Sequence, residues 1–171
     1  FVESYKAYIL AIIHRLNVRA GHSEDMLQEV LVELWKSLPK FEYRPGECRF
    51  RTWLALVSGR VVKNHLRSKA GRKIQQEVEY DEALDKITEP QIEAISEVEW
   101  KVFIAEKALG NVRPRLSPKL LTVFEASLAD VPDAEMAASL ETSEASVRVY
   151  RQRVRNALLK EIVRLNKELD S

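Results

Sequence analysis

The chain has 171 residues, 46% of them hydrophobic and 31% charged, and its formal net charge is +1. Such a chain can fold as one ordinary domain or as two small ones. No apolar run approaches the roughly 20 residues of a membrane span, so we expect no membrane insertion. The single cysteine, Cys48, excludes an internal disulfide and a multi-cysteine zinc site, and it fits a cytoplasmic location.

Charge is distributed unevenly along the chain. Residues 1–73 hold 14 Lys and Arg against 7 Asp and Glu, whereas residues 74–110 hold 3 against 10. This pattern predicts an N-terminal domain over 1–73, an acidic, partly helical linker over 74–110 and a C-terminal domain over 111–171. The basic surfaces would face an anionic partner. The alternative is three solvated helical faces whose charge bias is accidental.

The N-terminal domain begins with two predicted helices. The first has an apolar stripe at steps of three and four residues from Tyr5 to Leu16, and a break containing Gly21 follows. Ser23 is expected to cap the second helix, which ends near Pro39. The stripe that this helix should bury consists of Leu27, Val30, Leu31, Leu34, Trp35 and Leu38.

A third helix is predicted after a loop of charged and turn-forming residues, 40–49. Its expected buried stripe consists of Phe50, Trp53, Leu54, Val57, Val61 and Leu66. Its other face carries a polar and basic set, namely Arg51, Arg60, Lys63, Asn64 and Arg67.

The C-terminal domain carries the most informative pattern. A helix is predicted around Leu120–Leu128, Asp133 is expected to cap a short Ala-rich helix, and Thr142 or Ser143 should cap a long arginine-rich helix. A short helix, a turn and a basic second helix predict a helix-turn-helix that binds double-stranded DNA. The side chains expected to hold the pair together are Leu140, Val147 and Val154. The alternative is a surface helix with solvated arginines.

The predicted fold class is therefore all-α, with two small helical domains joined by an acidic linker. The sequence has no credible strand and no Gly-rich phosphate loop. His14, His22 and His65 lack the spacing of metal ligands. We therefore expect no enzyme activity, no cofactor or metal, and no small-molecule substrate.

Three segments, in this order and at these separations, resemble a bacterial RNA polymerase sigma factor of the extracytoplasmic-function group. They are D-M-L-Q-E-V-L-V-E-L-W at 25–35, F-R-T-W-L-A-L-V-S-G-R-V-V-K-N-H-L-R at 50–67, and the helix-turn-helix. The resemblance covers nearly the whole chain. It implies a protein that binds core RNA polymerase and directs promoter-specific transcription initiation.

The resemblance also implies roles for particular residues. Core polymerase, through a coiled coil of its largest subunit, would be bound by Glu24, Asp25, Gln28 and Glu29. The minus-ten element would be melted and recognised by Phe41, Tyr43, Arg51, Trp53, Arg60, Lys63, Asn64 and Arg67. The minus-thirty-five element would be bound by Ser143, Ser146, Arg148, Tyr150, Arg151, Arg153 and Arg155. The chemistry agrees, because melted DNA needs aromatic faces to replace base stacking and cations to hold the displaced strand.

The sequence departs from the family pattern at two positions. His22 stands where the family often has an acidic residue, and Glu141 stands in a turn that often carries glycine. Phosphorylation of Ser23 would restore negative charge beside His22, although a simple N-cap is the plainer interpretation of that serine. An anti-sigma factor is a further partner that the family implies. The alternative functions are a stand-alone helix-turn-helix transcriptional regulator and a helical protein-interaction module.

Overall fold

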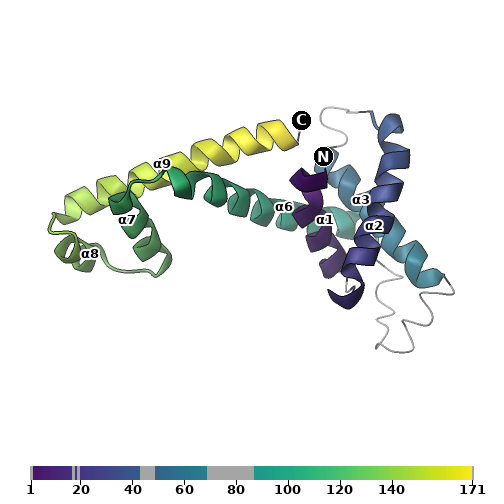
Figure 1. Ribbon diagram of the computed structural model, residues 1–171, viewed down its shortest axis with the longest axis horizontal. Coiled ribbons are helices and arrows are strands. Elements are labelled where there is room, and N and C mark those ends of the chain that lie inside the picture. Colours follow the sequence, from purple (N-terminus) through teal and green to yellow (C-terminus); the bar gives the residue numbers. More distant parts are fainter. Residues whose placement is uncertain (1, 17, 19, 43–48, 69–86, 171) are drawn as a thin grey trace. The chain divides into compact units, whose positions relative to one another are not determined.

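The computed structural model describes residues 2–16, 18, 20–42, 49–68 and 87–170. The helices of these ranges are α1 (Val2–Arg15), α2 (Ala20–Ser37), η1 (Leu38–Lys40), α3 (Phe50–Arg67), α6 (Glu89–Val112), η2 (Arg113–Arg115), α7 (Pro118–Leu128), α8 (Asp133–Ser139) and α9 (Glu144–Leu169) (Figure 1). The described ranges contain no strand, which confirms the predicted all-α fold class.

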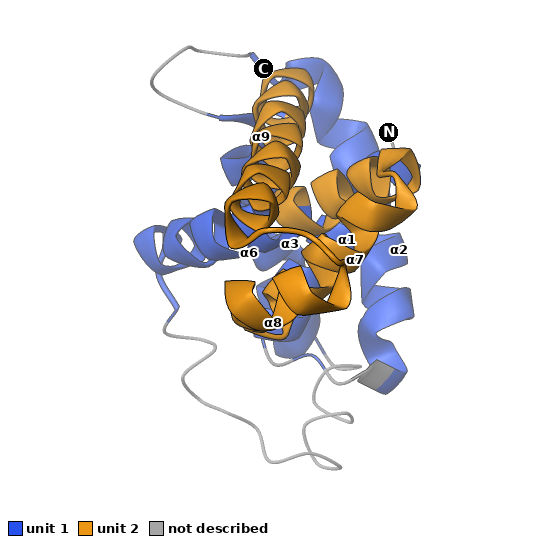
Figure 2. Cartoon of the chain, turned by 90° about the vertical axis from the view of Figure 1, so that its left-hand side faces the viewer, with its two compact units in different colours: residues 1–103, 170–171 blue, residues 104–169 orange. Residues whose placement is uncertain are grey.

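The chain divides into two compact units, residues 1–103 with 170–171, and residues 104–169 (Figure 2). The division falls inside α6, so each unit contains part of this helix. Of the predicted acidic linker over 74–110, the structure describes residues 87–110, and most of these form α6.

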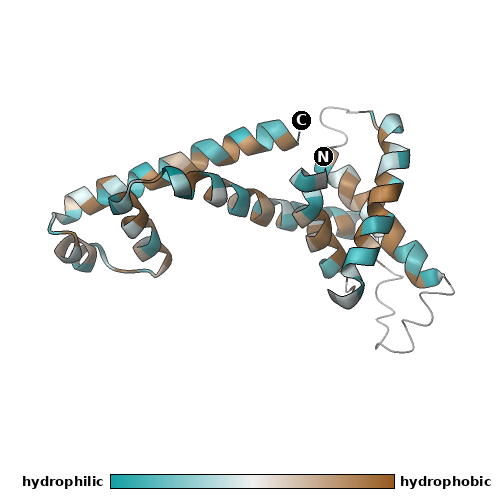
Figure 3. Cartoon of the chain, in the orientation of Figure 1, coloured by the Kyte–Doolittle hydropathy of each residue, from teal (hydrophilic) through white to brown (hydrophobic). Residues whose placement is uncertain are grey.

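The first unit is centred on α1, α2 and α3, which pack against one another. The predicted apolar stripe of α1 is confirmed, because Tyr8, Ile9, Ile12, Ile13 and Leu16 are all at most 1% exposed. Brown apolar bands alternate with teal polar bands along these helices (Figure 3). The helices of this unit are therefore held by a shared apolar core.

Tyr8 adds a polar connection inside this core. Its hydroxyl donates to the main-chain carbonyl of Arg51 at 3.2 Å and shares a hydrogen bond of 2.7 Å with Ser96 of α6. Its ring meets Trp100 edge-on, with centroids 5.2 Å apart. Burial raises the pKa of Tyr8, so the phenol stays neutral and can donate. Tyr8 thus joins α1 to both α3 and the first part of α6.

Two predictions for α2 were wrong. The helix begins at Ala20, so Ser23 is not its N-cap but a buried residue of the first turn, whose Oγ lies 2.9 Å from Nε2 of His14. A buried, hydrogen-bonded hydroxyl gives the phosphorylation hypothesis no accessible acceptor. Trp35 is not part of the buried stripe but 81% exposed. Leu34 lies on the buried stripe, and successive residues of a helix point about 100° apart. Trp35 therefore points away from the core.

The second unit contains a smaller core, formed by Val123 and Ala126 of α7, Met136 and Ala137 of α8, and Val147 of α9. Leu140 packs against this cluster and Val154 is buried, as predicted. The helix predicted around Leu120–Leu128 is α7; its buried residues include Val123 and Phe124, whereas Leu128 at its end is 66% exposed.

The connection between α8 and α9 is a tight turn. Of the two predicted caps, Thr142 and Ser143, the structure has Ser143, whose Oγ accepts a hydrogen bond of 3.2 Å from the amide of Ser146. Asp133 does not cap α8, because the N-cap position is Pro132 and Asp133 is the first helical residue. Glu141 has a φ of 48°, in the left-handed region that favours glycine. Its backbone therefore explains why a glycine suits this place in the turn.

Candidate functional site

One side of α2 presents a polar surface. Glu24, Asp25, Gln28 and Glu29 are all exposed, whereas Met26, Leu27 and Val30 between and beyond them are buried. The alternation fixes this face outward, because the apolar side of the helix is held in the core. Glu24 forms an exposed ion pair of 3.4 Å with Lys6 of α1. The structure thus brings the four predicted polymerase-binding residues onto one exposed face.

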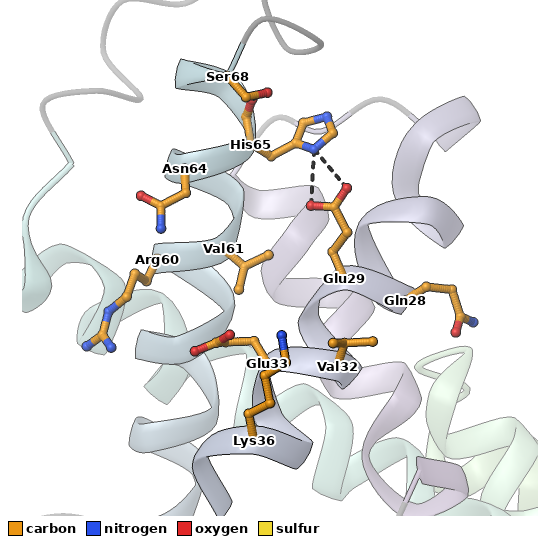
Figure 4. Close-up of a pocket in the computed structure, with 10 residues that line it drawn as sticks. All are labelled: Gln28, Glu29, Val32, Glu33, Lys36, Arg60, Val61, Asn64, His65 and Ser68. Carbon is orange, nitrogen blue, oxygen red and sulfur yellow. Dashed lines mark hydrogen bonds and ion pairs between the residues drawn. The ribbon is translucent and has the colours of Figure 1, made fainter.

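A groove of about 680 Å³ runs beside this face, between α2 and α3. Its lining consists of Gln28, Glu29, Val32, Glu33, Lys36, Arg60, Val61, Asn64, His65 and Ser68 (Figure 4). The α2 wall carries two carboxylates, and the α3 wall carries a guanidinium and an imidazole. The groove therefore joins residues predicted to bind polymerase with residues predicted to bind DNA.

Two apolar residues of α2 extend the exposed surface and were missed as functional candidates. Val32 is 53% exposed and Trp35 is 81% exposed. An exposed tryptophan beside carboxylates is a typical anchor for a protein partner. The signal in the sequence was an excess of apolar residues in α2, more than a single stripe can bury.

A half-buried aromatic cluster lies at the start of α3. The ring centroid of Trp53 is 4.7 Å from that of Phe41 and 5.6 Å from that of Phe50, and Phe50 also meets Tyr5 edge-on at 5.3 Å. The structure therefore brings together two of the predicted minus-ten residues, Phe41 and Trp53. A third, Tyr43, lies outside the described residues.

The predicted basic face of α3 contains exposed side chains and one half-buried side chain, Lys63. Arg60, Asn64 and Arg67 are exposed, so cationic and amide groups remain at the surface. Lys63 is half-buried and its Nζ donates to the main-chain carbonyl of Ile87.

Arg51 was predicted on the outer face of α3, and this prediction was wrong. The side chain lies in the interior of the first unit. It is 5% exposed, and its Nη2 donates to Oε1 of Glu97 at 2.7 Å. This hydrogen bond lowers the pKa of Glu97. The guanidinium also lies over the ring of Trp100, 5.6 Å from its centroid. The reason is periodicity, because Arg51 lies three and seven residues before the buried Leu54 and Ser58.

The residues predicted to bind DNA through α9 also separate into two groups. Ser146 and the exposed Arg153 line a shallow hollow of about 370 Å³, while Arg148 and Arg155 are also exposed. Tyr150 lines the same hollow but also packs against the core of the second unit, and Nζ of Lys119 lies 5.2 Å from its ring centroid.

Arg151 turns back toward the preceding helix. Its Nε lies 2.9 Å from Oδ1 of Asp133, and its Nη2 donates to the main-chain carbonyl of Val131. Its side chain is 26% exposed, against 66% for Arg148. Arg151 therefore fixes the start of α8 to α9, whereas Arg148 is presented to solvent.

The described ranges contain no group of three or more His, Cys, Asp and Glu side chains arranged to hold a metal ion. None of the helices in these ranges has the length and apolar content needed to cross a lipid bilayer.

No curated protein and no solved structure matches the chain. The family model described as Sigma-70 region 2 matches residues 1–72, the segment that contains α1, α2 and α3. This segment also holds the exposed face of α2, the groove and the aromatic cluster. Residues 1–72 are therefore similar to region 2 of the Sigma-70 family.

Proposed function

We propose that the protein is a sigma factor of the extracytoplasmic-function group, which binds core RNA polymerase in the cytoplasm and directs promoter-specific initiation. The observation that carries the proposal is the Sigma-70 region 2 match over residues 1–72. The protein would supply recognition and strand separation, while the polymerase performs the chemistry.

The polymerase-binding surface would be the exposed face of α2. Its carboxylates, Glu24, Asp25 and Glu29, suit a basic helical partner, and Gln28 can both donate and accept hydrogen bonds. Trp35 would add an apolar anchor beside these charges. This combination of one large aromatic group and a charged rim is typical of protein interfaces.

The minus-ten element would be opened at the start and outer face of α3. Phe41 and Trp53 offer half-buried rings on which an unstacked base can rest, and the exposed Arg60, Asn64 and Arg67 can hold the strand backbone. The buried Arg51 would keep α3 in place through Glu97 rather than touch DNA.

The minus-thirty-five element would be bound by α8 and α9 acting as a helix-turn-helix. Arg148 and Arg153, with Ser146, would face the major groove from the first turns of α9. Arg155 would reach the phosphate backbone from the next turn. Arg151 and Tyr150 would hold the recognition helix in position.

The proposal is tested by transcription in vitro with purified core polymerase and a library of genomic promoters. The expected result is initiation at a defined subset of promoters that depends on the added protein. Absence of initiation at every promoter would overturn the proposal.

A gel-shift assay separates the sigma factor from a stand-alone regulator. A sigma factor of this group should bind its promoter specifically only with core polymerase present. Tight specific binding by the protein alone would favour the regulator instead. Comparison at several salt concentrations is needed, because phosphate contacts alone give non-specific binding that weakens steeply with salt.

A further inference from the structure

A direct polar contact joins the two walls of the groove between α2 and α3. Nδ1 of His65 lies 3.0 Å from Oε1 and 3.1 Å from Oε2 of Glu29. The side chain of His65 is 16% exposed and that of Glu29 is 49% exposed. Figure 4 shows the imidazole turned from α3 toward the Glu29 carboxylate, while Arg60 extends away from it.

This geometry constrains the proton on the imidazole. An ionised carboxylate can only accept hydrogen bonds, so Nδ1 must carry the proton that it donates. A carboxylate has about four lone-pair positions, and His65 uses only the side that faces α3. The remaining positions stay open to solvent, because half of the Glu29 side chain is exposed.

We infer that His65 is a positioning residue for polymerase binding: it holds the Glu29 carboxylate in one orientation on the exposed face of α2. An unrestrained glutamate samples several rotamers, and a partner must immobilise it at an entropic cost. His65 reduces that cost in advance and aims the free oxygen positions at the partner's cations. This inference rests on the proposed function, since it assigns a role within the proposed polymerase-binding surface.

The inference is tested by measuring the dissociation constant of the full chain for core polymerase. His65→Ala should weaken binding about two- to fivefold, the range expected for losing one partly exposed hydrogen bond that holds a side chain in place. In a Glu29→Ala background, His65→Ala should have no further effect, because the carboxylate that it positions is gone. His65→Asn should restore most of the affinity, since its amide nitrogen can lie near the position of Nδ1.

His14→Ala is the matched control. It removes a hydrogen bond of 2.9 Å that likewise reaches α2, to the buried Ser23, but it does not touch the exposed carboxylates. The control should leave polymerase affinity unchanged, even where it lowers thermal stability as much as His65→Ala does. The ring nitrogen shifts of His65 should show protonated Nδ1 in the unmodified chain, and this preference should disappear in Glu29→Ala.

The outcomes separate the two claims. If the unmodified chain binds polymerase but His65→Ala binds equally well, the inference is wrong and the proposed function stands. The inference is also wrong if His65→Ala weakens binding equally in the Glu29→Ala background. If the unmodified chain does not bind polymerase at all, both claims fail.

Discussion

Arg148 and Arg151 lie three residues apart on α9. We expect Arg151→Ala to lower stability and Arg148→Ala to weaken promoter binding. Arg151→Ala removes the ion pair with Asp133 and the hydrogen bond that Nη2 donates to the Val131 carbonyl. The loss should lower the free energy of unfolding of the second unit by about 1–2 kcal/mol, because a partly buried carbonyl loses its donor and a partly buried carboxylate loses its ion pair. For a unit of this size, that corresponds to a fall in melting temperature of roughly 5–10 °C.

Arg148→Ala should leave stability almost unchanged, since its side chain is 66% exposed and its two carboxylate neighbours are both 3.9 Å away. It should instead cost about 1–3 kcal/mol of promoter binding if Arg148 reads a base. If it contacts only phosphate, binding to all sequences should weaken alike and the salt dependence should flatten.

The assay combines thermal unfolding, followed by circular dichroism, with promoter affinity of the reconstituted polymerase complex at several salt concentrations. The reasoning would be refuted if Arg151→Ala lost promoter affinity as strongly as Arg148→Ala while keeping its melting temperature. Arg151 would then be a DNA contact, and its pairing with Asp133 would be incidental.

Three further changes test other parts of the structure. Trp35→Ala should weaken polymerase binding by about 2 kcal/mol or more without lowering thermal stability, because the ring is 81% exposed; equal affinity in a direct titration would exclude Trp35 from the interface. Hydrogen bonds from Arg164 and then Asn111 lower the pKa of Glu161 to about 2. The carboxylate should therefore contribute its full stabilisation above its ordinary pKa of 4.5, and this stabilisation should be lost as the pH falls toward 2. Melting temperatures between pH 2 and 6 should show this loss, and Glu161→Gln should flatten it. Gly59→Leu should lower the free energy of unfolding, measured in urea, by about 1–3 kcal/mol, because even a Cβ there would lie 2.6 Å from Cδ1 of Ile92. Adding Ile92→Ala to the same chain should recover part of this loss.

The three helices of residues 1–67 were predictable because apolar residues recur along them at the period of an α-helix. The stripe of α1 and the cap of α9 at Ser143 needed no tertiary information. The exposed polar face of α2 followed from the same periodicity, since residues between buried positions must point outward.

Tertiary contacts decided the residues that were assigned wrongly. Arg51 was predicted at the surface because arginine is rarely buried, although its spacing to Leu54 and Ser58 places it on the buried side of α3. Its anionic partner Glu97 and its aromatic partner Trp100 belong to α6, far away in the sequence. Arg151 was predicted as a DNA contact because it is an arginine on the basic helix. Its pairing with Asp133 depends on the packing of α8 against α9, which the sequence does not reveal. Trp35 was predicted in the buried stripe because it lies four residues after Leu31, but Leu34 is the buried residue of this pair of neighbours and Trp35 points to solvent.

The exposure of Trp35 has an optical consequence. The sequence has three tryptophans, Trp35, Trp53 and Trp100, and all belong to the first unit. Indole emission shifts to shorter wavelength when water is removed from the ring. Trp35 is almost fully hydrated and Trp100 is only 2% exposed, so the two emit from opposite environments. A Trp53→Phe chain would therefore report docking on α2 through Trp35 and unfolding of the first unit through Trp100, without any attached dye.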